Sequence, residues 1–208
     1  MTIIVFLPIN KISTISTTTL TQKSIIMPTV NELLSRNSQT SQSHRPLPTI
    51  AEAHSAGEGP PRIALISCCD ARVVPEEYFG LKPKDAIVFR TIAGHPQGCW
   101  KDLVALDTFM AEGFGTGGFE ELAVVHHTDC GSLIFTNDLI HEGIKKRNPG
   151  QRIEDIIGTE FGAVETSMEQ NVRDDLEWLK SAPLIRKELA ERARGFVYDI
   201  KTGRVYEV

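Results

Sequence analysis

Two apolar stretches of the chain end in residues that bind metals or move protons: Arg62-Ile-Ala-Leu-Ile-Ser-Cys-Cys-Asp-Ala-Arg72 and Glu121-Leu-Ala-Val-Val-His-His-Thr-Asp-Cys-Gly131. Runs of roughly four to eight residues that are apolar at every position are typical of strands covered on both faces, as in a parallel sheet flanked by helices. In such sheets, ligands collect in the crevice outside the carboxyl ends of the strands. The pattern therefore predicts that the two strand ends meet and form one site.

The composition is that of an ordinary globular protein. The 208 residues are 41% hydrophobic and 24% charged, with a formal net charge of -5, which predicts one domain with a tail. Because no cluster of Lys and Arg is dense enough to follow a phosphate backbone, no nucleic-acid partner is expected. No stretch approaches the roughly 20 apolar residues of a membrane helix, so no membrane partner is expected either. The four cysteines suggest reduced thiols rather than a disulfide scaffold.

Residues 1–28 are expected to form a disordered N-terminal extension, followed by a single zinc domain over residues 29–208. The extension is rich in Ser, Thr and Ile, and Lys11 and Lys23 are its only charged side chains. Its apolar start, Met1 to Leu7, lacks the basic leader and the length of a secretory signal, so a cytoplasmic protein is expected. Mitochondrial delivery is the alternative if residues 1–26 act as a transit peptide, although such peptides usually contain arginine.

The order of patterns predicts an α/β fold, with a mainly parallel β-sheet flanked by helices and a short C-terminal antiparallel strand. Strands are expected at 62–67, 85–90, 120–126, 196–200 and 204–208. Helices are expected at 29–36, 101–112, 133–146, around the apolar stripe Met168, Val172, Leu176 and Leu179, and at 184–194. Residues 37–61 are polar and rich in Pro and Gly, which predicts a linker or a loop that wraps around the domain.

Three residues at the strand ends form a donor set for zinc. Catalytic zinc sites combine three protein ligands, drawn from thiolate, imidazole and carboxylate, with one open position. Cys68, His127 and Cys130 supply two thiolates and one imidazole. The spacing to Cys130 favours His127 over its neighbour His126 as the imidazole ligand.

Asp70 and Arg72 predict an acid that stays ionised beside this metal. Two thiolates neutralise the charge of Zn2+, so the ion needs a carboxylate that accepts a hydrogen bond from its water. Asp70 lies two residues after Cys68, and Arg72 lies two residues further on. A guanidinium fork matches a carboxylate in two contacts and lowers its pKa. An ordinary buried ion pair is the alternative interpretation.

The motif Cys68-x-Asp70-x-Arg72, followed by His127-x-x-Cys130-Gly131, resembles the signature of the β-class carbonic anhydrases. The resemblance runs from about Met27 to the C-terminus and is greatest to the compact members without long N-terminal arms. It implies a mainly parallel sheet flanked by helices, and a homodimer or a larger homo-oligomer. It also implies a small-molecule substrate, since the family catalyses the reversible hydration of carbon dioxide to bicarbonate.

Carried over by residue, the resemblance implies one Zn2+ per chain. Cys68, His127 and Cys130 would be its ligands, and Asp70 with Arg72 would form the catalytic dyad. Asp70 would be a fourth ligand in a closed resting state, as in some members, and Gly131 would border the substrate.

Two other functions remain open. Close relatives of this family hydrolyse carbonyl sulfide or carbon disulfide, and sequence does not give the pocket access that would distinguish these substrates. The other is a non-catalytic zinc-binding protein. Structural zinc sites usually close with four protein ligands, so a permanent bond from Asp70 to zinc would favour this function.

The chain departs from the family pattern at two places. His126 stands where members often have Gly, and Arg90-Thr-Ile-Ala-Gly94 is one residue longer than the usual Arg-Asn-Ala-Gly. His95 has no partner visible in the sequence. Of the remaining cysteines, Cys69 is expected to pack in the core and Cys99 to be a loop thiol.

Overall fold

The computed structural model describes residues 27–208. The predictions for residues 1–26, a disordered extension or a transit peptide, lie outside the described residues. The chain divides into one unit that ends at Pro48 and another that spans Thr49–Val208. The single domain over 29–208 stays a prediction. Within the described range, no helix has both the length and the apolar character needed to span a bilayer.

The described part of the first unit is mainly the helix α1 (Val30–Thr40) with a short 3-10 turn, η1 (Ser41–Ser43). A capping box begins α1, because the Thr29 hydroxyl accepts from the amide of Glu32 and the Glu32 carboxylate accepts from the amide of Thr29. The helix continues past the predicted end at residue 36, and none of its residues is buried within its own unit.

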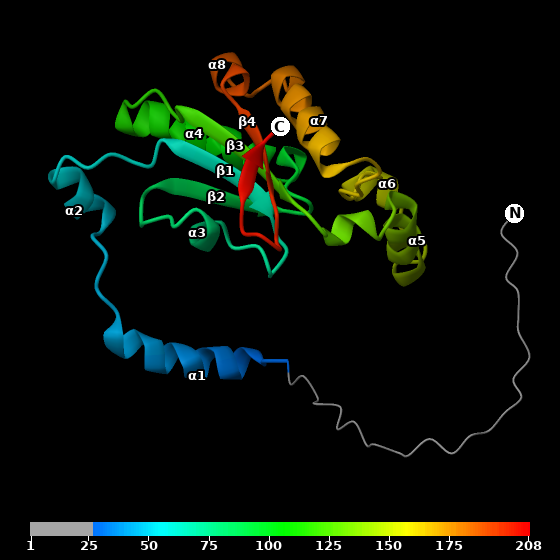
Figure 1. Ribbon diagram of the computed structural model, residues 1–208, viewed down its shortest axis with the longest axis horizontal. Helices are drawn as coiled ribbons and strands as arrows, with labels where there is room; N and C mark the ends of the chain where they lie inside the picture. Colours follow the sequence, from blue (N-terminus) through cyan, green and yellow to red (C-terminus); the bar gives the residue numbers. More distant parts are fainter. Residues whose placement is uncertain (1–26) are drawn as a thin grey trace, which may run out of the picture. The chain divides into compact units, whose positions relative to one another are not determined.

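The second unit contains one five-stranded sheet in the order β2-β1-β3-β4-β5 (Figure 1). All neighbouring strands are parallel except β4 and β5, which are antiparallel. This confirms the predicted α/β class and the antiparallel C-terminal strand. The strands are β1 (Ile63–Cys68), β2 (Ala86–Thr91), β3 (Glu121–His127), β4 (Arg194–Tyr198) and β5 (Val205–Glu207).

The register brings the reactive ends of the strands to one edge. Cys68 pairs with Thr91 of β2, and His127 pairs with Tyr198 of β4. The last five residues of β1 and the last four of β3 are buried, as expected for central strands covered on both faces. The carboxyl ends of β1 and β3 therefore meet at the same edge.

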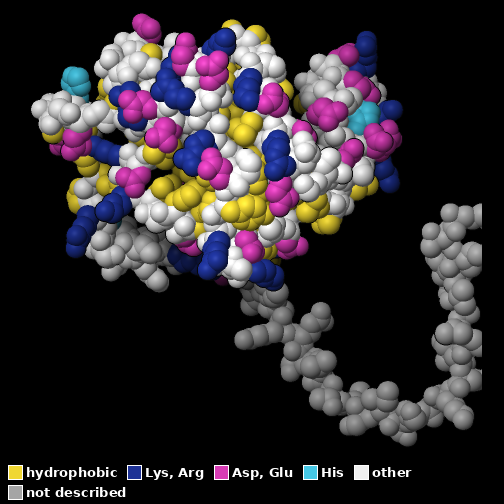
Figure 2. Space-filling view, turned by 45° about the horizontal axis from the view of Figure 1, so that its top comes forward, with side chains coloured by type: hydrophobic (Ala, Val, Ile, Leu, Met, Phe, Trp, Pro, Cys, Tyr) yellow, Lys and Arg dark blue, Asp and Glu magenta, His cyan; other side chains and the backbone are white. Residues whose placement is uncertain are grey.

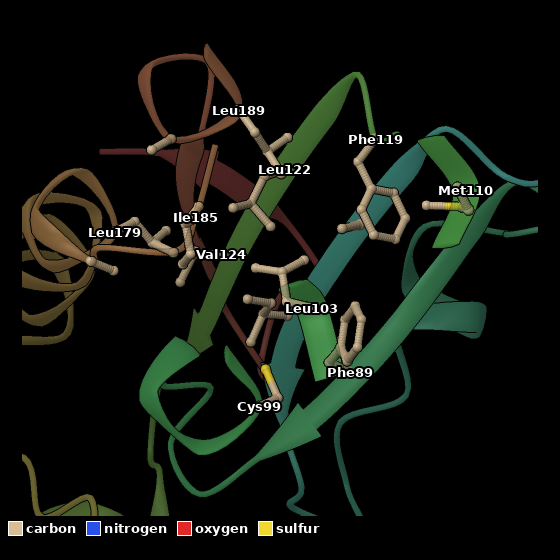
Figure 3. Close-up of a cluster of buried hydrophobic side chains, with 14 residues drawn as sticks. Phe89, Cys99, Leu103, Met110, Phe119, Leu122, Val124, Leu179, Ile185 and Leu189 are labelled. Carbon is tan, nitrogen blue, oxygen red and sulfur yellow. The ribbon is translucent and has the colours of Figure 1, made fainter. Parts of the chain in front are cut away.

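Helices cover the two faces of the sheet unequally. Figure 1 shows α4 (Trp100–Phe114), α7 (Met168–Ser181) and α8 (Lys187–Glu191) on one side and the short α3 (Pro75–Tyr78) on the other. The main core lies under the first group, where the labelled side chains of Figure 3 point toward one another between strands and helices. Leu103 of α4, Leu179 of α7 and Leu189 of α8 are each at most 1% exposed.

The remaining elements are short. They are α2 (Ile50–Ser55), η2 (Pro96–Gly98), η3 (Gly131–Leu133), α5 (Asn137–Arg147) and α6 (Ile153–Ile157). The predicted helix over 133–146 begins later, at Asn137, because the Thr136 hydroxyl caps it by accepting from the amide of Leu139. The helix predicted at 184–194 is shorter, and residue 194 already belongs to β4.

Candidate metal centre

Cys68, His127 and Cys130 converge at the carboxyl edge of the sheet. Cys68 is the last residue of β1, His127 is the last residue of β3, and Cys130 follows three residues later. All three are buried, and one donor atom from each lies within 4.8 Å of the others. The sequence proposed these same three residues as metal ligands.

The spacing of these donors fits a tetrahedral zinc ion. Zn–S bonds of about 2.3 Å at a tetrahedral angle place two thiolates ~3.8 Å apart, and the Sγ atoms of Cys68 and Cys130 are 3.8 Å apart. The Nδ1 atom of His127 donates to the Thr128 carbonyl at 2.9 Å. Its Nε2 atom is buried and has no hydrogen-bond partner among the described residues, which leaves a lone pair for an ion.

The thiols of Cys68 and Cys130 are in contact, and either sulfur can donate to the other. The contact with Cys68 lowers the pKa of Cys130 well below its ordinary value, against the cost of burying a charge, and the neighbouring His127 and Ser132 also lower it. The same contact, together with burial, raises the pKa of Cys68 well above its ordinary value. Ser132 Oγ donates to Cys130 Sγ at 3.0 Å. Because metal ligation needs both thiolates, a bound cation would displace the thiol protons.

Asp70 and Arg72 form the predicted bidentate pair. Arg72 Nε donates to Asp70 Oδ1 at 3.1 Å and Nη2 donates to Oδ2 at 2.7 Å. These hydrogen bonds from Arg72 lower the pKa of Asp70 to about 2. Asp70 Oδ2 lies 3.9 Å from His127 Nε2, so an ionised acceptor stands beside the three donors. The role of Asp70 as a fourth ligand stays a prediction.

Asp129 and Ser132 contribute contacts that the sequence did not indicate. The Oδ2 atom of Asp129 accepts from Arg72 Nη1 at 2.7 Å, and the Asp129 carbonyl accepts from Arg72 Nη2 at 2.8 Å. Its φ of 56° is in the left-handed region, which aspartate tolerates better than most residues. Arg72 therefore ties the two sequence motifs together. Gly131 is exposed, and a Cβ there would meet no atom within 4 Å; its substrate contact stays a prediction.

His126 does not compete for the centre. Its Nε2 atom lies 2.8 Å from Asp175 Oδ2, on the face covered by α7. The prediction that Cys69 packs in the core was wrong, because β1 ends one residue before it and Cys69 is exposed. Cys99 lies in the turn before α4, as expected for a loop thiol, and is buried in the main core.

A cavity with a volume of about 670 Å³ lies elsewhere. Ile92, His95, Phe161 and Trp178 are among the residues that line it. None of the three donors lines this cavity, and neither does Asp70 or Arg72.

The fold and the centre define an α/β protein with two thiolates and one imidazole at the carboxyl edge of a parallel sheet. A family model described as "Carbonic anhydrase" matches residues 63–205. The chain belongs to the β-class carbonic anhydrase family.

Similar proteins carry two different activities in their names. A "Beta-carbonic anhydrase 1" of Mycobacterium bovis is 32% identical over 148 residues, covering 70% of this chain and 81% of that protein. A "Carbon disulfide hydrolase" of Acidianus is 31% identical over 164 residues, covering 69% and 76%. The crystal structure of a carbonic anhydrase from Streptococcus mutans is 27% identical with a TM-score of 0.65, covering 88% of this chain and 99% of that one.

Proposed function

We propose that this protein is a zinc-dependent carbonic anhydrase that hydrates carbon dioxide reversibly to bicarbonate. One observation carries the proposal: the three buried donors of the centre lie next to a carboxylate that an arginine holds in two contacts. A structural zinc site would be expected to offer a fourth protein ligand. Here the nearby carboxylate is engaged with Arg72 through both of its oxygens.

Cys68, His127 and Cys130 would hold one Zn2+ per chain. When bound, zinc supplies Lewis acidity that lowers the pKa of a water in its open position. The hydrogen bond from His127 to the Thr128 carbonyl fixes the ring so that Nε2 faces the other two donors.

Asp70 orients the attacking water. With its pKa lowered to about 2 by Arg72, it is ionised throughout the neutral range and can only accept hydrogen bonds. An acceptor in a fixed place takes a hydrogen bond from one O–H of the water and turns a lone pair of the oxygen toward the carbon of the substrate. Arg72 keeps this acceptor in place through the bidentate contact and its second anchor on Asp129.

Carbon disulfide or carbonyl sulfide is the second candidate substrate, since the Acidianus relative is named a carbon disulfide hydrolase. All three molecules are linear, and Asp70 and Arg72 would orient water in the same way for each. The dyad therefore supports attack of water on a linear electrophile and does not distinguish between oxygen and sulfur.

We also propose that the chain forms a homodimer or a larger homo-oligomer. Several large apolar side chains of the second unit are exposed, and Figure 2 shows apolar side chains gathered in the middle of the face drawn. Between residues 131 and 158, the exposed apolar side chains include Ile134, Leu139, Ile156 and Ile157, each more than half exposed. Patches of this kind usually mark interfaces. Cytoplasmic location stays a prediction.

Metal analysis and paired activity assays test the proposed function. We expect about one zinc per chain after purification under reducing conditions, and carbon dioxide hydration in a stopped-flow pH-indicator assay. Parallel assays would follow sulfide release from carbonyl sulfide and carbon disulfide. Sulfide release faster than carbon dioxide hydration would make the chain a hydrolase. Bound zinc with no turnover of any of the three would make it a non-catalytic zinc-binding protein.

A further inference from the structure

A second cluster of ionisable side chains lies beside the metal centre. Asp175 of α7 is buried and accepts two contacts through its carboxylate. His126 Nε2 lies 2.8 Å from Oδ2, and His95 Nδ1 lies 2.9 Å from Oδ2 and 3.0 Å from Oδ1. The three residues come from β3, from the loop after β2 and from α7, so one carboxylate connects three elements.

These distances are those of hydrogen bonds and not of a second metal site. Zinc bonds of about 2.0–2.1 Å at a tetrahedral angle separate nitrogen and oxygen ligands by ~3.3 Å. The observed separations of 2.8 to 3.0 Å match N–H···O hydrogen bonds instead. The thiolates of the first centre, by contrast, have the spacing of metal ligands.

Asp175 is the acceptor in both contacts. Burial raises the pKa of Asp175, but the hydrogen bonds from His126 and His95 outweigh it and lower the pKa below its ordinary value. An ionised carboxylate has no proton to donate, so both imidazoles donate to it. Charge-assisted hydrogen bonds of this kind are about twice as strong as neutral ones.

The residues that Asp175 holds are next to the metal ligands. His126 directly precedes His127 on β3. His95 follows a strained turn in which buried Ala93 has a φ of 60° and Gly94 has a φ of 94°. A Cβ on Gly94 would lie 3.3 Å from the amide nitrogen of Cys68 and 3.3 Å from the ring of His126. The turn is therefore packed directly against the end of β1 and the cluster.

We propose that Asp175 is a positioning residue for the metal centre. By accepting hydrogen bonds from His126 and His95, it fixes the end of β3 and the strained turn against β1, and so sets the directions from which His127 and Cys68 offer their donor atoms. The inference rests on the proposed metal binding and not on the identity of the substrate. It gives a function to His126, which replaces the glycine that family members often carry.

Two substitutions at Asp175 distinguish a positioning role of its carboxylate from a role of its side chain in packing alone. Asp175→Leu removes the acceptor and keeps a branched, although larger, side chain, whereas Asp175→Asn keeps one acceptor oxygen in the same place. In the full-length holoenzyme, we expect Asp175→Leu to weaken zinc affinity about 10-fold in chelator competition. We also expect it to shift the visible ligand-field bands of the Co2+-substituted protein, and Asp175→Asn to restore most of both properties.

Asp107 offers a matched control. It is also a buried acid, and it accepts from Arg186 and from the amide of Phe119, before the start of β3 and so at the other end of that strand. Asp107→Leu should lower thermal stability and leave the Co2+ bands and zinc affinity as in the wild type. Equal spectral shifts in the two leucine variants would reduce Asp175 to a general packing role and overturn the proposal.

A second pair of variants, at His95, tests the proposal if Asp175→Leu does not fold. His95→Leu removes one donor, and His95→Asn restores an N–H near the position of Nδ1. His95→Leu should show part of the spectral shift, and His95→Asn should show little.

Wild-type bands in both Asp175→Leu and His95→Leu would overturn the proposal. So would a second equivalent of zinc that is lost in Asp175→Leu but retained in Cys68→Ser. Loss of carbon dioxide hydration in every form would count against the proposed substrate alone, because the spectra and affinities do not depend on turnover.

Discussion

The guanidinium of Arg72 joins two carboxylates from separate motifs. It contacts both oxygens of Asp70, and its remaining nitrogen contacts Asp129. All three groups are at least partly exposed, so the pair contributes little to the stability of the fold. Its effect is on the position and charge of Asp70, and a substitution should therefore affect activity more than stability.

Arg72→Ala is expected to reduce carbon dioxide hydration about 100-fold while zinc content stays near one per chain. Without the guanidinium, the pKa of Asp70 moves back up toward its ordinary value and its carboxylate loses its orientation. Arg62→Ala is the matched control, because it removes the exposed pair of Arg62 with Glu120 just before β1. The measurements are stopped-flow rates and metal analysis. Full activity in Arg72→Ala would remove the dyad from the mechanism.

The lowered pKa of Asp70 in the folded protein predicts a loss of stability at very low pH. Its pKa is lowered by Arg72 from an ordinary 3.8 to about 2, so the pair stabilises the fold above the ordinary pKa and loses this effect as the pH falls through about 2. The carboxyl signal of Asp70 in an NMR pH titration of the metal-free protein should therefore have its midpoint near pH 2. In Arg72→Ala the midpoint should move up. A midpoint near the ordinary value in the wild type would contradict the bidentate contact.

At the residue scale, the sequence indicated the donors but not their supports. Two motifs with thiolate, imidazole and acid at fixed spacing predicted Cys68, His127, Cys130, Asp70 and Arg72. Asp175 was missed, although it lies on the stripe of Met168, Val172 and Leu179, where an acid indicates a buried partner. The partner itself could not be found, because only the packing of α7 on the sheet shows which histidines it reaches.

The backbone of the turn after β2 packs against β3 close to the metal centre. Gly94 has a φ of 94°, and a Cβ there would lie 3.0 Å from the carbonyl oxygen of Val125. Both the left-handed conformation and the lack of space exclude a side chain, so the glycine is needed for the turn to approach β3.

Gly94→Ala is expected to lower the free energy of unfolding by about 2–4 kcal/mol, because backbone strain and overpacking add together. Gly80→Ala is the control, since its φ of 62° is also left-handed but nothing lies within 4 Å of the added Cβ. That variant should cost only about 1–2 kcal/mol. Urea unfolding of both variants measures the difference. Equal costs would mean that the turn moves away from β3 at no penalty.

The two thiols outside the centre should differ strongly in reactivity. Cys99 is buried at the start of α4, and burial raises its pKa to about 12, whereas Cys69 is exposed. The folded state favours the neutral thiol of Cys99, so this stabilisation is complete below its ordinary pKa of 9.0 and is lost as the pH rises through about 12. Iodoacetamide at pH 8 should modify Cys69 in the zinc-loaded protein and leave Cys99 unmodified, as peptide mass spectrometry would show. Equal labelling of the two would contradict this burial.

At the element scale, long periodic segments were predictable and short ones were not. Each strand of the sheet was expected within two residues of its observed start, and so was α4. The helices α2, α3 and α6 have six, four and five residues, too few turns for a hydrophobic period to appear. Their presence depends on local features such as the Thr49–Glu52 capping box of α2 and the stacking of Tyr78 of α3 on Tyr198 of β4.

For the whole molecule, strand polarity alone places the centre, because parallel strands end at one edge. The sequence therefore predicted where the site would lie before any contact was known. It did not predict a unit boundary near Pro48, because the polar composition of residues 37–61 is common to linkers and to loops that pack on a domain.

Metal removal should loosen one edge of the sheet more than the other. A ligand that binds only the folded state stabilises it by about 4 kcal/mol at a free concentration of 1,000 times its Kd, so a zinc chelator should lower the Tm of the wild type. The same chelator should not change the Tm of Cys130→Ser, which lacks one donor.

Hydrogen exchange then shows which part of the sheet becomes less stable when zinc is removed. The amides of Cys69 and Thr128, which donate to Thr91 and Tyr198 at the carboxyl edge, should exchange faster without zinc. The amide of Glu120, which donates to Arg62 at the opposite edge, should change little. Uniform acceleration at both edges would mean that the ion stabilises the whole sheet and does not act as a local tie between β1 and β3.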